Sequence, residues 1–387
     1  MSRPTSGGDL GVYVHVPFCE RVCPYCDFAV TAVGRLAEAD DAELGELLRL
    51  EWRRWREALA GRTVATVYFG GGTPSLLRPK SLDAILSMLA ADLRFAEPEI
   101  TVELNPGQLE VARVPELRAL GVTRLSVGLQ SAGDAVLRRL GRAQSASEAL
   151  RGLEACLAAG FASVSADLIY GAPGQTVAGL LDDAERVLAL GVPHVSAYAL
   201  TLEGDTPFVR AAEAGRLELP DEDAVLEMSR LLRARLAAGG LAQYEISSFA
   251  RPGHRSRHNQ RYWRRAEVLG LGPSAASFVA GRRLRNARSL DDWRRALRGS
   301  TPVCVEDEAI SEAEARREAL YLGLRRLAGV RRADYLREFG ARPEAFLGPE
   351  LERLRSRELV RDEAGALRLT ERGILFADEV FQELVGR

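Results

Sequence analysis

The chain has 387 residues, 47% of them hydrophobic and 27% charged, which is globular composition with room for one large domain and a smaller one. Its 52 Lys and Arg nearly balance 54 Asp and Glu, so the whole chain lacks the basic surplus of a nucleic-acid-binding protein. No apolar run reaches the roughly 18 residues of a membrane span, and the first ten residues lack a secretory signal, so we expect a cytoplasmic protein.

Short β-branched runs alternate with longer amphipathic stretches over the first 200 residues. The runs predict strands at 12–16, 64–69, 100–104, 124–128, 163–169 and 194–200. The stretches predict helices at 42–59, 82–93, 136–140, 146–159 and 177–190. Such alternation is typical of βαβ units around a parallel sheet. Six units, rather than eight, favour an incomplete barrel, so the predicted fold class is α/β.

The pattern changes after residue 200. A helix is predicted at 220–239, a strand at 241–249 and a loop at 269–277, with a basic and aromatic stretch at 251–265 between the last two. From about residue 305 the chain is helical and charged, and it ends in β-like pieces at 359–365 and 366–370 and a last helix, as in a small winged-helix domain. We therefore expect a barrel over 1–220, a connecting region over 221–304 and a C-terminal helical domain over 305–387.

Three of the five cysteines, Cys19, Cys23 and Cys26, follow the first predicted strand within eight residues. In a reducing compartment such a cluster indicates metal ligation rather than disulfides. Three thiolates bind three irons of a 4Fe–4S cubane and leave the fourth iron open. S-adenosylmethionine (SAM) needs such an open iron, which its amino and carboxylate groups chelate. The alternative, a structural zinc site, usually has four protein ligands, and no further Cys or His follows soon after Cys26.

A second motif is the glycine run at Gly70, Gly71 and Gly72, which follows a predicted strand and precedes a helix. Glycine lets the backbone turn sharply and approach a ligand closely. By itself the run fits a tight turn or a phosphate-binding loop equally well, although it lacks the lysine of a P-loop. Its position one βα unit after the cysteines favours a loop that binds the amino group of SAM.

Polar residues also lie at successive strand ends: Glu103, Asn105, Gln130, Arg142 and Asp167. The carboxyl ends of parallel strands are where ligands collect in α/β proteins. A carboxylate there can bind a ribose hydroxyl or an ammonium group. Each residue alone fits a helix cap or a buried pair, but their recurrence favours one ligand site.

Together these motifs resemble the HemN/HemW branch of the radical SAM superfamily, over roughly residues 10–380. The resemblance rests on the cysteine motif with Tyr25, on the GGGTP loop and on the stretch DLIYGAPGQT. It implies a partial (βα)6 barrel with a C-terminal extension, a 4Fe–4S cluster and SAM. It also implies the following roles: Tyr13 and Tyr25 flank the cluster and the adenine, Gly71, Gly72, Thr73 and Glu103 line the SAM site, and Gln130, Arg142 and Asp167 match contacts to a second SAM in oxidase members.

Two kinds of member must be separated. The oxygen-independent coproporphyrinogen III oxidases have a further Cys two residues after the third cluster ligand, where this chain has Phe28, and they begin with a long N-terminal segment. The heme-chaperone members have CDF at this place and a later HNxxYW motif, which this chain matches with His258, Asn259, Tyr262 and Trp263. The resemblance therefore favours a protein that carries heme to apo-hemoproteins such as respiratory cytochromes. Membrane-associated recipients and a homodimer are compatible with it, and the alternatives are the oxidase reaction or another radical SAM enzyme.

The HNxxYW motif suggests how heme is held. His258 is the candidate iron ligand through a neutral imidazole, with Tyr262 and Trp263 packed on the porphyrin and neighbouring arginines paired with its propionates. A structural histidine beside the barrel is an equally weighted alternative. One departure from the family is Gln144, which stands where members commonly have His.

Overall fold

A twelve-stranded sheet runs through the larger part of the chain in this computed structural model, which describes residues 8–299 and 301–386. Its parallel centre consists of β1 (Leu10–Val16), β4 (Thr63–Gly71), β5 (Arg94–Leu104), β6 (Arg124–Gln130), β7 (Ser163–Tyr170) and β8 (His194–Ala199). All six strands predicted from the sequence are present, in chain order. The sheet does not close on itself, so the incomplete barrel is confirmed.

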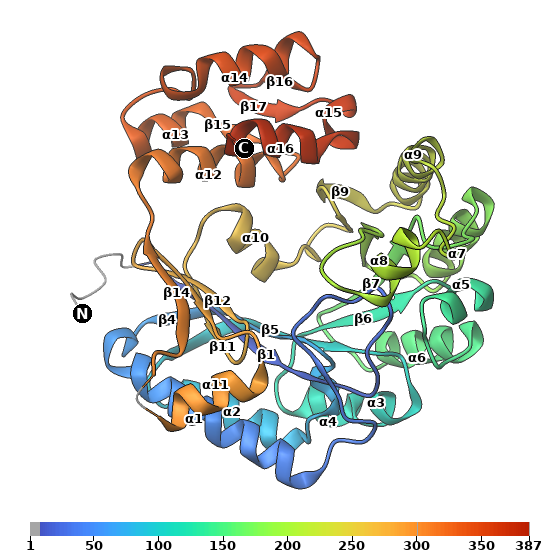
Figure 1. Cartoon of the computed structure of the whole chain (residues 1–387), viewed down its shortest axis with the longest axis vertical. Helices are drawn as coiled ribbons and strands as arrows, with labels where there is room; N and C mark the ends of the chain where they lie inside the picture. Colours follow the sequence, from blue (N-terminus) through green and yellow to red (C-terminus); the bar gives the residue numbers. More distant parts are fainter. Residues whose placement is uncertain (1–7, 300, 387) are drawn as a thin grey trace.

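Helices cover the outer face of this sheet (Figure 1). They are α1 (Glu38–Leu59), η1 (Pro74–Leu76), α2 (Pro79–Ala90), α3 (Gln108–Ala112), α4 (Val114–Ala119), α5 (Asp134–Arg139), α6 (Ala146–Ala158), α7 (Val177–Ala189) and α9 (Glu222–Ala238). The short helix α8 (Pro207–Glu213) lies instead against the cysteine loop. Local signals set several of their starts. Pro79 begins α2, where a missing N–H costs nothing, and Ser145 forms a capping box with Glu148 at α6.

The central strands alternate between an apolar and a polar face. In β6, Leu125, Val127 and Leu129 are buried in the main hydrophobic core under the helices. The alternate positions of the same strand, Ser126 and Gly128, line a cavity inside the barrel. Successive side chains of a strand point to opposite faces, so the inner face of this barrel is polar although little of it is exposed.

Further strands extend the sheet on both sides. Beyond β1 lie β11 (Val268–Leu271), β12 (Ala276–Val279), β13 (Arg282–Asn286) and β14 (Cys304–Ala309), and beyond β8 lie β10 (Ser248–Ala250) and β9 (Ala242–Glu245). The loop predicted at 269–277 is therefore wrong in part, because β11 is a seventh parallel strand beside β1. A four-residue apolar run with a glycine in it is too short to show a period. The single strand predicted at 241–249 is two antiparallel strands, and β14 precedes the helices expected from 305.

The C-terminal part has its own core and lies at one end of the molecule (Figure 1). It contains α12 (Glu312–Leu324), β15 (Val330–Arg331), α13 (Arg332–Phe339), α14 (Glu344–Ser356), β16 (Val360–Glu363), β17 (Ala366–Leu369), α15 (Glu371–Leu375) and α16 (Ala377–Val385). A three-stranded antiparallel sheet packed on helices is the winged-helix-like arrangement predicted. The domain boundaries expected at 220 and 304 stay predictions.

Helix α10 (Arg257–Trp263) lies between the barrel and this C-terminal part, and the Arg325 guanidinium stacks over the Trp263 ring at 4.2 Å. Just after α10, Arg265 pairs with Glu318 of α12 at 3.1 Å. Helix α11 (Leu290–Arg298) packs instead against α1, where Arg294 pairs with Glu43 at 2.8 Å.

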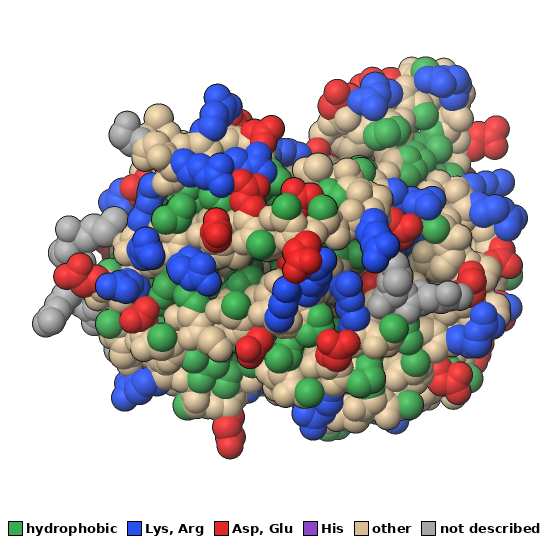
Figure 2. Space-filling model, turned by 90° about the horizontal axis from the view of Figure 1, so that it is seen from below, with side chains coloured by type: hydrophobic (Ala, Val, Ile, Leu, Met, Phe, Trp, Pro, Cys, Tyr) green, Lys and Arg blue, Asp and Glu red, His purple; other side chains and the backbone are tan. Residues whose placement is uncertain are grey.

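The outer surface carries mixed charge. On the face shown in Figure 2, Lys and Arg side chains are interspersed with Asp and Glu. Among the helices of the described residues, none is both long and apolar enough to cross a membrane.

Candidate functional site

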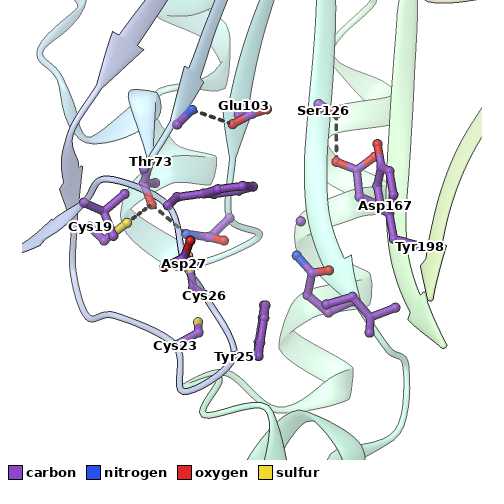
Figure 3. Close-up of a pocket in the computed structure, with 18 of the residues that line it drawn as sticks. Cys19, Cys23, Tyr25, Cys26, Asp27, Thr73, Glu103, Ser126, Asp167 and Tyr198 are labelled. Atoms are coloured by element: carbon purple, nitrogen blue, oxygen red, sulfur yellow. Dashed lines mark hydrogen bonds between the residues drawn. The ribbon is translucent and has the colours of Figure 1, made fainter. Parts of the chain in front are cut away.

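A cavity of about 540 Å³ opens at the carboxyl ends of the central strands (Figure 3). It brings together most of the residues singled out in the sequence. These are Cys19, Cys23, Tyr25, Cys26, Gly71, Gly72, Thr73, Glu103, Asn105, Gln130, Arg142 and Asp167. The cysteine loop and Asp167 lie on opposite sides of the cavity (Figure 3), which leaves space between them for a bound molecule.

The cysteines lie on one loop between β1 and α1 that is tied down at several points. The strands β2 (Phe18–Cys19) and β3 (Thr31–Ala32) pair with each other across its base. His15 of β1 bonds through Nε2 to the carbonyl oxygen of Ala29 at 2.9 Å. The N–H of Phe208, at α8, donates to the carbonyl of Pro24 at 2.9 Å. A loop of this length, held from both sides of the barrel, can present three thiols at fixed places.

The glycine run of β4 packs directly against the start of the cysteine loop. The N–H of Gly72 donates to the Val16 carbonyl at 2.8 Å, and the N–H of Thr73 donates to the Phe18 carbonyl at 2.7 Å. A Cβ on Gly72 would lie 2.5 Å from the Phe18 oxygen, so only glycine allows this approach. The Thr73 hydroxyl in turn donates to the Cys19 sulfur at 3.7 Å.

Arg142 is the cation nearest to the thiols. Its Nη1 is 3.7 Å from the Cys23 sulfur, and its Nη2 donates to Asn105 Oδ1 and to the Gly128 carbonyl, both at 2.6 Å. Its Nε is buried without a partner among the described residues. A fixed guanidinium with one donor left over suits a site that receives an anionic or electron-rich group.

The thiols are not arranged for a single ion. Within residues 8–299 and 301–386, no three His, Cys, Asp or Glu side chains converge closely enough to hold one metal. A cubane cluster differs, because each thiolate binds a different iron. Burial raises the pKa of Cys19 to about 11 and also raises that of Cys26, so both thiols keep their protons at neutral pH and must lose them to bind iron.

Glu103 is a buried carboxylic acid at the centre of the cavity wall. Its Oε1 accepts from the Tyr68 hydroxyl at 2.7 Å, and its Oε2 accepts from the N–H of Gly71 at 3.2 Å. Burial raises its pKa to about 7 despite these two bonds, and the charge of Asp167 adds to the shift. A cation placed beside Glu103 would favour its ionised form.

Gln130 and Asp167 occupy the far side of the cavity. Gln130 ends β6 in the left-handed region with a φ of 66°, where the pairing register of β6 with β7 shifts. Such backbone strain in a residue other than glycine persists where the surrounding structure holds it, often at ligand sites. Burial raises the pKa of Asp167, against the hydrogen bonds of three serines.

Two of the predicted site residues lie elsewhere. Tyr13 lines an adjoining cavity of about 380 Å³, which shares Gly71 and Glu103 with the first. His258 lines neither cavity, and the residue is only 1% exposed. Its Nδ1 bonds to the Thr66 hydroxyl at 2.8 Å and its Nε2 to the Tyr262 hydroxyl at 3.0 Å. Burial lowers its pKa to about 3, so the ring is a neutral, doubly bonded imidazole with neither nitrogen available to an iron in this conformation.

The arginines near His258 are also engaged. Arg261 donates to the Asp9 carboxylate at 3.0 Å, and Arg265 pairs with Glu318. Of the HNxxYW motif it is Asn259 that reaches the main cavity.

Four further lining residues were not predicted from the sequence: Tyr68, Ser126, Ser196 and Tyr198. All four are inward-facing strand residues. Their signal was the polar residue at every second position of β4, β6 and β8, which a strand buried on both faces does not need for its packing.

Comparison with known proteins shows the family of the chain. The radical SAM superfamily model matches residues 13–187, and the HemN C-terminal domain matches residues 310–376. A heme chaperone HemW from Mycobacterium tuberculosis is 35% identical over 384 residues, which cover 99% of this chain and 96% of the relative. The heme chaperone HemW of Escherichia coli is 32% identical over 378 residues, covering 96% and 97%. The chain belongs to the HemW family of the radical SAM superfamily.

The fold of this HemW-family chain also occurs in a solved structure. The coproporphyrinogen III oxidase HemN from Escherichia coli superposes with a TM-score of 0.84 over 97% of this chain and 90% of that one. Its sequence is 23% identical, so the likeness concerns the fold. The resemblance noted in the sequence is thereby confirmed at the level of family and fold.

The cavity fits the cofactors that membership of the radical SAM superfamily implies. Cys19, Cys23 and Cys26 would hold a 4Fe–4S cluster, with Arg142 beside Cys23 balancing its negative charge. SAM would lie against Gly71, Glu103 and Arg142, whose Nε has no partner among the described residues. When bound, the cluster supplies an electron that can cleave a carbon–sulfur bond of SAM.

A pH dependence follows from Glu103. Its pKa in the folded protein, about 7, lies above that of an ordinary glutamate, so the free energy of unfolding falls as pH rises from about 4.5 to about 7. Because the positive sulfonium charge of SAM favours the ionised form, we expect SAM affinity to rise through the same range and then level off. Equilibrium dialysis of reconstituted protein between about pH 6 and about pH 8 measures this. Glu103→Gln should bind SAM more weakly and without the rise; an unchanged rise would assign it to another group.

Proposed function

We propose that this chain is a heme chaperone: it binds heme and passes it to apo-hemoproteins, and it carries a SAM-binding 4Fe–4S cluster. The observation that supports this most strongly is the match over 96% or more of the chain to several relatives that bear this name. Respiratory cytochromes, including membrane-associated ones, are the recipients we propose. A homodimer is the proposed assembly.

Phe28, two residues after the last cysteine of the cluster motif, supports a chaperone rather than an oxidase. Phe28 occupies the place of the additional oxidase cysteine, and its side chain is 70% exposed at the mouth of the cavity. A phenyl ring offers neither the polarity nor the redox chemistry of a thiol. Oxidative decarboxylation of coproporphyrinogen III is the alternative activity, and the fold likeness to HemN carries no argument for it at 23% identity.

The bonding of His258 in this structure argues against its role as the heme ligand. To reach an iron, the ring would have to give up its bond to Thr66 or to Tyr262 and leave a position that is 1% exposed. In either case the hydroxyl that the ring leaves would lose a buried hydrogen bond. We therefore expect His258 to hold α10 in place and the iron ligand to come from another residue.

The test is a pair of assays on anaerobically reconstituted protein. Heme titrated into the wild type should give a saturable Soret band. The same protein, with reductant, SAM and coproporphyrinogen III, should form no protoporphyrinogen IX. SAM-dependent release of carbon dioxide from this substrate would overturn the chaperone assignment in favour of the oxidase.

His258→Ala tests the ligand separately. We expect nearly unchanged heme affinity and Soret position, with lower thermal stability because two buried hydrogen bonds are lost. If the variant loses the Soret band but keeps its fold by circular dichroism, His258 is the iron ligand after all. In that case α10 must move to expose it.

A further inference from the structure

Asp167 is the inner end of a chain of hydrogen bonds that crosses the interior of the barrel. Its Oδ2 accepts from the Ser126 hydroxyl at 2.7 Å, as Figure 3 shows, and its Oδ1 accepts from the Ser165 hydroxyl at 3.0 Å. Ser165 lies two positions earlier on β7, on the same inner face. Both serines are largely buried, at 8% and 1% exposure. Asp167 itself lines the main cavity.

This chain of hydrogen bonds continues away from the cavity. The Ser165 hydroxyl lies 2.7 Å from Nδ1 of His194 on β8, and Nε2 of His194 lies 2.9 Å from the hydroxyl of Tyr244 on β9. The Tyr244 oxygen accepts from the backbone N–H of Ser256 at 3.1 Å. Ser256 is the N-cap of α10, so the outer end is held by the segment that carries the HNxxYW motif.

The donors and acceptors set the direction of this chain. The Ser256 N–H can only donate, so the Tyr244 oxygen accepts from it and the Tyr244 O–H is left to donate to His194 Nε2. An imidazole that accepts at Nε2 carries its proton on Nδ1, which donates to the Ser165 oxygen. The Ser165 O–H then points at Asp167. Burial, followed by the charges of Arg124 and His254, keeps the pKa of His194 well below its ordinary value, so the ring is neutral as this arrangement requires.

We propose that Ser165, His194 and Tyr244 are positioning residues for Asp167, and that they hold its carboxylate ionised and aligned to accept a hydroxyl or ammonium donor of SAM in the cavity. Ser126 donates to one oxygen and Ser165 to the other, and Ser196 is a third hydrogen-bond partner. A carboxylate has roughly four lone-pair sites, so at least one stays free for the ligand. The inference rests on membership of the radical SAM superfamily and not on heme transfer. Failure of the heme assays would therefore leave it standing.

Several other groups face Asp167 and must be considered in a pH experiment. Glu103 on β5 adds negative charge, Arg124 on β6 adds positive charge, and the phenols of Tyr68 on β4 and Tyr198 on β8 stay neutral because their pKa values are raised. All of these are unchanged in variants of Ser165 or His194. The difference between the pH profiles of variant and wild type therefore reports Asp167.

The experiment measures SAM affinity by equilibrium dialysis on anaerobically reconstituted protein with its cluster content checked. We expect Ser165→Ala and His194→Leu each to weaken SAM binding about ten-fold. Ser165→Ala removes a hydrogen bond to the carboxylate, and His194→Leu removes the N–H that orients the Ser165 hydroxyl toward it. Without that donor the pKa of Asp167 rises further, so the affinity of these variants falls off at a higher pH than that of the wild type. Tyr244→Phe removes the hydroxyl that fixes the tautomer of His194, and it should weaken SAM binding less than the other two substitutions.

Two variants separate positioning from packing. His194→Asn keeps an amide N–H near the Nδ1 position and should restore affinity to near the wild-type value. Ser131→Ala removes another short buried serine–aspartate bond, 2.7 Å to Asp183, that lies outside the cavity, and it should leave SAM affinity unchanged. Wild-type affinity at every pH in Ser165→Ala and His194→Leu would overturn the proposal. So would a His194→Asn variant as weak as His194→Leu, or an equal loss in Ser131→Ala.

Discussion

Replacing Cys19, Cys23 and Cys26 together by alanine should leave a folded protein that holds no iron and no acid-labile sulfide after anaerobic reconstitution. Each thiolate supplies the only protein ligand to one iron, so nothing anchors the cluster once all three are gone. The wild type should hold close to four irons and four sulfides per chain by the same reasoning. Iron and sulfide analysis with ultraviolet–visible spectra measures both quantities.

Cys304→Ser is the matched control for this experiment. Cys304 is also a free, partly buried cysteine, but it lies at the start of β14, outside the cavity, where its thiol bonds only weakly to Asn286 Oδ1 at 3.5 Å. We expect full cluster content in this variant. Zinc without sulfide in the wild type would contradict the assignment of the three cysteines to an iron–sulfur cluster.

Gly72→Val should have an effect almost as large. Its Cβ would lie 2.5 Å from the Phe18 oxygen and 2.8 Å from the Val16 oxygen, and both of these are backbone atoms that cannot swing aside. The hydrogen bonds from Gly72 and Thr73 to the same two carbonyls would break as the chains move apart. Because Phe18 directly precedes Cys19, the cysteine loop should shift with them.

Two measurements follow this shift. Cluster content after reconstitution should fall to less than about half, and the change that SAM causes in the electron paramagnetic resonance spectrum of the reduced cluster should disappear. Gly45→Ala is the control, because Gly45 lies within α1 and a Cβ there meets nothing within 4 Å. It should gain up to about 1 kcal/mol of stability from helix propensity and keep the cluster. A Gly72→Val protein with full cluster and a normal SAM response would show that the close backbone approach is not required.

The cluster motif could be predicted because its chemistry is local. Three thiols within eight residues, directly after a strand, specify their own neighbourhood whatever the rest of the chain does. The six central strands were predictable for a similar reason, since each is a β-branched run bounded by turn residues. The glycine run could be recognised in the sequence. The sequence did not show why residue 72 must be glycine: a side chain there would collide with the carbonyl of Phe18, more than fifty residues earlier in the chain.

His258 shows the limit of motif reasoning. The motif identified a histidine of special importance, and a free imidazole is a good iron ligand. Which groups lie opposite its two nitrogens depends on how α10 packs against β4, and only the folded chain brings Thr66 to Nδ1. The hydrogen bonds from Ser256 to Asp167 likewise join four elements, the start of α10, β9, β8 and β7, and no spacing in the sequence indicates them.

The sequence by itself determined the six central strands, the cysteine motif and the family, because these depend on local periodicity and on residue types at short spacing. Only the tertiary structure decided which polar side chains line the cavity and which hydrogen-bond to one another instead. It also decided that β11 pairs with β1. The physical reason is that a strand buried on both faces shows only which residues alternate, and the folding of the whole sheet with its helices decides which face becomes the interior. Tyr68, Ser126 and Ser196 are polar residues at ordinary strand positions, and only the tertiary fold places them around one cavity.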